Sequence, residues 1–130
     1  MEKKLKKKIL IVDDEPAIIR LLSLRLKHNG YDIFEASNGL ECIEIVSKNL
    51  PNLILMDIQM PHCDGINAFK VLSENECTKE IPVLFMTAFP KNDIVSKVVR
   101  MGAKGCISKP FVSKDFEESI ELALNWKLYI

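Results

Sequence analysis

Neither sign of charge is in excess in this 130-residue sequence, because 18 Lys and Arg residues balance 18 Asp and Glu residues. Proteins that bind nucleic acid directly carry a basic excess, so that function is not expected. Long apolar runs are also missing, and stretches such as 53–56 are far too short to span a bilayer. The lysine-rich start is followed by acids and not by the apolar core of a signal peptide. We therefore expect a cytoplasmic protein that is not inserted in a membrane.

Paired cysteines and glycine-rich loops are lacking as well. The four cysteines include no Cys-x-x-Cys pair, and only two histidines could complete a metal cluster. A zinc site is therefore not expected, and the cysteines are interpreted as free thiols. The loop after the first apolar run reads Asp-Asp-Glu-Pro and contains no glycine. Nucleotide-binding turns need glycines so that backbone amides can approach phosphate, and this loop argues against such a site.

Short apolar runs alternate with longer segments of helical spacing. The runs cover residues 9–12, 31–36, 53–56, 82–86 and 105–108, and each precedes a segment with apolar residues three or four apart. Runs that are apolar on both faces need helices on both sides, which is typical of a parallel sheet. Five units are too few for an eight-unit barrel, so the sequence predicts an α/β fold with an open, doubly wound (βα)5 sheet.

The charge distribution suggests how the chain is organised. Residues 1–8 hold five lysines and one acid, and we interpret them as a basic N-terminal arm. This arm is either a solvated chain end or an extension of the first strand. Residues 9–126 are expected to form one domain, and residues 127–130 a short C-terminal end.

Polar residues stand where the expected strands end. Asp13 and Asp14 follow the first run, Asp57 the third, Thr87 the fourth and Lys109 the fifth. Ligands of open α/β sheets bind at the carboxyl ends of the strands, so these side chains are expected to meet. Clustered carboxylates bind hard divalent cations such as Mg²⁺ through oxygen. A metal, a lysine and a threonine together could hold a phosphoryl group, and one carboxylate could be its nucleophile, although spacing does not indicate which one.

The motifs in these positions resemble the receiver domain of two-component response regulators, of the single-domain chemotaxis or sporulation-phosphorelay type. The matching segments follow successive strands of the expected sheet and cover residues 9–15, 55–61, 64–65, 82–88 and 102–111. The resemblance implies a flavodoxin-like strand order of 2-1-3-4-5, which is known for this family. It also implies a signalling protein and not a classical enzyme, one that catalyses only its own phosphorylation and dephosphorylation.

The resemblance assigns a phosphoacceptor and a metal site. Asp57 would accept a phosphoryl group from a histidine kinase, a phosphotransfer protein or a small acyl phosphate. Asp14, Asp57 and the backbone carbonyl of Gln59 would ligate Mg²⁺ directly, whereas Asp13 would act mostly through water.

Two further residues receive roles in the same way. Lys109 would pair with the phosphoryl oxygens, and its bond to Pro110 would be cis. Thr87 would move to hydrogen-bond the phosphoryl group and so report its presence. We expect no output domain after the last helix, so the signal would pass to a downstream protein target or along a phosphorelay. We expect a monomer or a dimer that forms on phosphorylation.

The sequence departs from the family pattern at two positions. Cys106 occupies the switch position where the family usually has an aromatic residue, and a small thiol cannot carry the signal of a rotating ring. Phe89, two residues after Thr87, has no group to orient a hydrolytic water, which predicts slow self-dephosphorylation. The face around Cys106 would be the surface that changes partners, and the other residues expected near it are Ile94, Val95, Lys97 and Lys104.

Two other functions are alternatives to a receiver domain. A small phosphotransfer enzyme on the same fold, such as a phosphatase of the haloacid dehalogenase type, would need an Asp-x-Asp pattern after the first strand. The sequence has Asp13 and Asp14 side by side instead. An interaction module that is no longer phosphorylated would have lost Asp57, Lys109 or Asp14, and all three are present.

Overall fold

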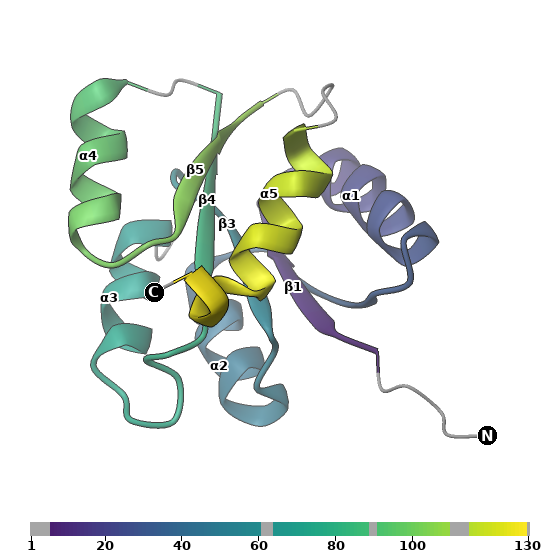
Figure 1. Ribbon diagram of the computed structural model, residues 1–130, viewed down its shortest axis with the longest axis horizontal. Helices are drawn as coiled ribbons and strands as arrows, with labels where there is room; N and C mark the ends of the chain where they lie inside the picture. The colour runs from purple at the N-terminus through teal and green to yellow at the C-terminus, as the bar shows by residue number, and fades with distance from the viewer. Residues whose placement is uncertain (1–5, 61–63, 89–90, 110–114, 130) are drawn as a thin grey trace.

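The structure is a computed structural model that describes residues 6–60, 64–88, 91–109 and 115–129. Strands and helices alternate along the described chain (Figure 1). The strands are β1 (Lys8–Val12), β2 (Asp32–Ala36), β3 (Leu53–Asp57), β4 (Val83–Thr87) and β5 (Gly105–Ser108). The helices are α1 (Pro16–His28), α2 (Gly39–Asn49), α3 (Gly65–Ser73), α4 (Asn92–Arg100) and α5 (Asp115–Leu124), and a short 3₁₀ helix, η1 (Trp126–Tyr129), follows α5.

The five strands form one parallel sheet in the order β2-β1-β3-β4-β5, which confirms the predicted architecture. Their carboxyl ends are nearly level. Val12 of β1 pairs with Met56 of β3, and Asp57 pairs with Met86 of β4. Thr87, the last residue of β4, pairs with Ser108 of β5. The residues that follow these strands are therefore delivered to one edge of the sheet.

Helices cover both faces of the sheet, as the apolar runs require (Figure 1). Alternate strand residues face opposite sides. Leu10 and Val12 of β1 pack with side chains from α2, α3 and α4, whereas Ile9 and Ile11 pack with side chains from α1 and α5. Burial on both sides explains why these strands lack polar alternation.

Local residues set the helix boundaries. Pro16 occupies the first turn of α1, and Asn38 and Asp64 cap α2 and α3 by accepting hydrogen bonds from Glu41 N and Asn67 N.

The predicted arm at residues 1–8 overlaps the first strand by one residue. β1 begins at Lys8, because the Lys8 carbonyl accepts a hydrogen bond from Asn52 N and the Lys7 carbonyl accepts one from Asp32 N. These bonds attach Lys7 and Lys8, the last two residues of the range predicted as an arm, to the neighbouring chain segments.

Leu50 ends α2 in the left-handed conformation, with φ of 44°. This conformation costs an L-residue about 1–2 kcal/mol, whereas glycine adopts it freely but adds about 0.5–1 kcal/mol of unfolded-state entropy. Leu50→Gly is therefore expected to raise the free energy of unfolding by roughly 0.5 kcal/mol, measured by urea denaturation. As a control, Leu24→Gly in the exposed middle of α1 should lower it by about 1 kcal/mol. A loss of stability in Leu50→Gly would contradict the prediction.

Candidate functional site

The carboxyl edge of the sheet gathers the polar residues that the sequence places after the strands. Asp13 follows β1 and is fully buried, and Asp14 beside it is exposed. Asp57 and Thr87 are the last residues of β3 and β4, and both are buried. Lys109 follows β5, and its backbone amide donates a 2.8 Å hydrogen bond to the Thr87 carbonyl. The residues come from four strand ends that are far apart in sequence.

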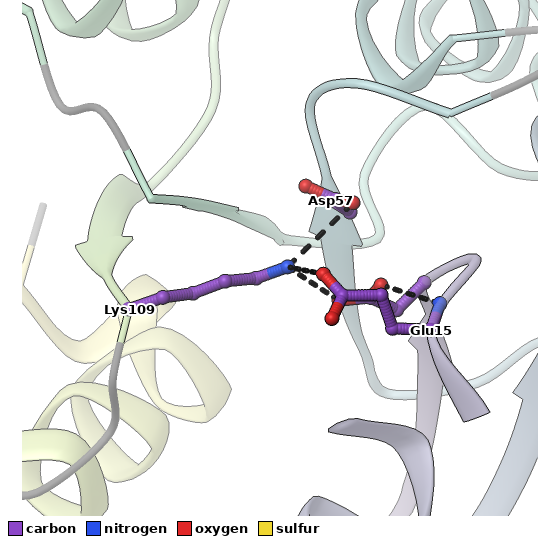
Figure 2. Close-up of polar contacts among 4 residues, drawn as sticks. Glu15, Asp57 and Lys109 are labelled. Atoms are coloured by element: carbon purple, nitrogen blue, oxygen red, sulfur yellow. Dashed lines mark hydrogen bonds and ion pairs between the residues drawn. The ribbon is translucent and has the colours of Figure 1, made fainter. Parts of the chain in front are cut away.

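Lys109 reaches across the site and carries its cation to three carboxylates (Figure 2). Its Nζ atom donates a 2.7 Å hydrogen bond to Asp13 Oδ2. The same atom lies 3.6 Å from Asp57 Oδ2 and 3.8 Å from Glu15 Oε1. Because the side chains of Lys109, Asp13 and Asp57 are at most 10% exposed, these three charges interact with little screening by water.

Three carboxylates form a group that could hold a metal ion. Oxygen atoms of Asp13, Asp14 and Asp57 all lie within 4.8 Å of one another. The donors are all hard oxygens, which suits Mg²⁺ and not a soft metal. The donor set therefore fits the predicted divalent cation. Gln59 lies two residues beyond β3, and its backbone amide hydrogen-bonds Asp57.

The electrostatics of Asp57 show that negative charge is crowded at this edge. Burial, followed by the charge of Asp13, raises the pKa of Asp57 to about 6, although Lys109 acts in the opposite direction. Burial alone would lower the pKa of Lys109. Its hydrogen bond to Asp13 and the charges of Asp57, Asp13 and Glu15 outweigh burial and raise that pKa. A single lysine therefore does not neutralise the cluster.

Gly65 packs against the backbone that carries Asp57, a role that its place in the sequence does not predict. A Cβ atom on Gly65 would lie 2.1 Å from the Asp57 carbonyl oxygen and 2.9 Å from Met56 Cγ. The Gly65 amide also donates a hydrogen bond to the Ile58 carbonyl. The Asp64-Gly65 pair predicts a helix start, which is confirmed, but sequence alone does not show that α3 begins in contact with β3.

Cys106 lies in β5, half-buried, and packs against the core shared by α2, α3 and α4. Burial raises the pKa of its thiol, which favours the protonated form, and Cys106 is a free thiol as predicted. α4 packs beside β5, so half-buried Ile94 and Val95 lie on the element next to Cys106. Phe89, Pro110 and the proposed cis bond lie outside the described residues.

Comparison with known proteins shows the family. The model for the response regulator receiver domain matches residues 9–121, and the chain belongs to this family. It is 37% identical over 123 residues to the sporulation initiation phosphotransferase F of Bacillus subtilis. The match covers 92% of this chain and 95% of that protein. It is 36% identical over 122 residues to the probable transcriptional regulator ycf27 of Porphyridium aerugineum. That match covers 92% of this chain and 49% of the regulator, so the chain spans about half of its length.

Solved structures agree with this assignment. The chemotaxis protein CheY4 of Vibrio cholerae superimposes with a TM-score of 0.86 and 25% identity, over 92% of this chain and 99% of that one. The receiver domain of Francisella response regulator 1452 gives a TM-score of 0.81 and 26% identity, over 96% of this chain and all (100%) of that one. The chain is thus a response-regulator receiver domain, and the phosphatase-like alternative is not favoured. No helix in the described part of the chain is long and apolar enough to cross a membrane.

Proposed function

We propose that the receiver domain accepts a phosphoryl group on Asp57 from the phosphohistidine of a histidine kinase or phosphotransfer protein. The observation that carries this proposal is the position of the Lys109 cation, which lies within 4 Å of both Asp57 and Asp13 at the edge where the carboxylates meet.

The contacts of Lys109 support Asp57 as the nucleophile among the three aspartates. Both oxygens of Asp13 already accept hydrogen bonds, Oδ1 from Glu15 N at 3.0 Å and Oδ2 from Lys109 Nζ. Asp14 is exposed, and in the described part of the chain it forms no ion pair with Lys109. Asp57 is close to the ammonium without being hydrogen-bonded to it, so a phosphoryl group on Asp57 would meet the cation directly.

The reaction would transfer the phosphoryl group from a histidine nitrogen of the donor to an oxygen of Asp57. An Asp57 oxygen forms a bond to the phosphorus atom while the donor P–N bond breaks, and the electron pair stays with the imidazole. Lys109 would pair with a phosphoryl oxygen and Thr87 would hydrogen-bond another. Asp13, Asp14, Asp57 and the Gln59 carbonyl would hold Mg²⁺, which when bound would supply positive charge that offsets the charge of the phosphoryl group.

The signal would then pass to another protein. The Bacillus relative is named a phosphotransferase, which supports a place in a phosphorelay or contact with a downstream target. The surface of α4 and β5 around Cys106 is proposed as the partner-binding face. The domain would catalyse only its own phosphorylation and dephosphorylation, in the cytoplasm, as a monomer or a phosphorylation-linked dimer.

Incubation with acetyl phosphate and Mg²⁺ tests the proposal. Wild-type protein is expected to gain the mass of one phosphoryl group, and Asp57→Asn is expected to gain none, measured by intact-mass spectrometry. Chelation of Mg²⁺ should also prevent the reaction. As a matched control, Asp93→Asn removes one exposed carboxylate from α4 and should react like the wild type. Phosphorylation of Asp57→Asn to the wild-type extent would refute the proposal.

A further inference from the structure

The Lys109 ammonium lies between two carboxylates that differ in their access to solvent. Its Nζ atom is 3.6 Å from Asp57 Oδ2 and 3.8 Å from Glu15 Oε1 (Figure 2). The Asp57 side chain is 9% exposed, whereas the Glu15 side chain is 62% exposed. Of these two carboxylates, Glu15 is therefore the one that is exposed to a phosphodonor in solution.

The backbone of Glu15 is held independently of its side chain. Its amide donates to Asp13 Oδ1, and its carbonyl accepts from Ile18 N at 3.1 Å and Ile19 N at 3.2 Å in the first turn of α1. A change confined to the carboxylate leaves these bonds in place. The effect of its charge can therefore be measured without disturbing the loop.

Glu15 differs from the other carboxylates around Lys109 in its relation to the metal. Asp13, Asp14 and Asp57 form the group that could hold a cation, and Glu15 is not a member of it. A bound Mg²⁺ would offset the charge of those three groups directly. The Glu15 charge would remain at the mouth of the site, next to the lysine that the phosphoryl group needs.

Resting on the proposed function, we propose that Glu15 determines donor specificity by repelling free, highly charged phosphodonors and by competing with them for Lys109. Two unit charges about 6 Å apart in water interact by an energy that corresponds to roughly a threefold change in rate. A dianionic donor should therefore be slowed about tenfold, and a monoanionic donor about threefold. Glu15 is a positioning residue in this scheme, because it acts through Lys109 and through its charge, and forms no bond to phosphorus.

Two small donors of different charge test this inference. Acetyl phosphate is a dianion near neutral pH, and acetate leaves with the electron pair of its P–O bond as the Asp57–phosphorus bond forms. Phosphoramidate is a net monoanion whose nitrogen is already protonated, so ammonia leaves as its P–N bond breaks. Both reactions balance without an oxidant or an added acid.

Glu15→Gln is the informative variant, assayed with saturating Mg²⁺ at low ionic strength. Its phosphorylation rate is expected to rise about tenfold with acetyl phosphate and about threefold with phosphoramidate, and the difference should shrink in high salt. Glu15→Asp keeps the charge and should keep the wild-type ratio of the two rates. Glu74→Gln makes the same change in net charge at the far end of α3 and should leave both rates unchanged.

The outcomes separate this inference from the proposed function. Equal rates in Glu15→Gln and wild type, an equal increase with both donors, or a decrease with either would overturn the role of Glu15. If wild-type protein is not phosphorylated, or if Asp57→Asn is, the proposed function itself fails. Thermal unfolding of each variant establishes that a rate difference does not come from misfolding.

Discussion

Gly65→Ala is expected to lower the free energy of unfolding by about 3 kcal/mol, because the site has no room for a methyl group. The new Cβ would lie 2.1 Å from the Asp57 carbonyl oxygen, and the obstructing atom belongs to the backbone of a buried central strand. Relief requires α3 or the end of β3 to move. The variant is therefore also expected to displace Asp57 and lose most of its phosphorylation by acetyl phosphate.

Gly30→Ala is the matched control for this prediction. Gly30 has a φ of 95°, and an added Cβ would meet no atom within 4 Å. That change costs backbone strain alone, about 1 kcal/mol, and lies away from the site. Urea denaturation of both variants measures the difference. A loss in Gly65→Ala no larger than in Gly30→Ala would show that the contact between α3 and β3 is not tight.

Asp57→Asn is expected to raise the free energy of unfolding of metal-free protein by about 2 kcal/mol at pH 7.5, because it removes a costly negative charge. Burial and the charge of Asp13 raise the pKa of Asp57 in the folded protein to about 6, whereas an unfolded aspartate has a pKa of about 4. Between these values the folded state binds more protons than the unfolded state. Its stability therefore falls as the pH rises from about 4 to about 6, and levels off above that.

The pH and metal dependence give this prediction its sharpest test. The stability advantage of Asp57→Asn should shrink toward zero near pH 4, where the wild-type carboxyl group is protonated in the folded protein. Added Mg²⁺ should stabilise the wild type and act weakly on the variant. Thermal unfolding in chelator and in Mg²⁺, across this pH range, measures both effects. An advantage that is independent of pH would mean that the ionised carboxylate is not the source of the cost.

Local residue patterns predict most of this fold. Apolar runs such as Ile9–Val12 identify strands buried on both faces, and Pro16 and the Asp64-Gly65 pair indicate helix starts because these signals depend on neighbouring residues alone. The edge that collects the polar side chains follows as well, since parallel strands end on one side.

What the sequence does not reveal depends on distances between elements. The crowding of Gly65 against Asp57 arises from how α3 is seated on β3, which no local pattern reports. Spacing does not choose a nucleophile among three aspartates either. The two hydrogen bonds on Asp13, which support the proposal of Asp57 as the nucleophile, are seen only once Lys109 and the Glu15 amide are placed in space. The contact of Glu15 with Lys109 is likewise invisible in a sequence that separates them by most of its length.

The hydrogen bond from the Lys109 amide to the Thr87 carbonyl couples the backbone at the end of β4 to the backbone that follows β5. β5 is an edge strand with β4 as its neighbour, so the sheet restrains it on one side only. A displacement of Lys109 would therefore also displace the peptide group of Thr87, because the two backbones are hydrogen-bonded. This backbone coupling between Lys109 and Thr87 does not depend on the size of the side chain at position 106. It is therefore available in a receiver domain that has Cys106 in place of an aromatic residue.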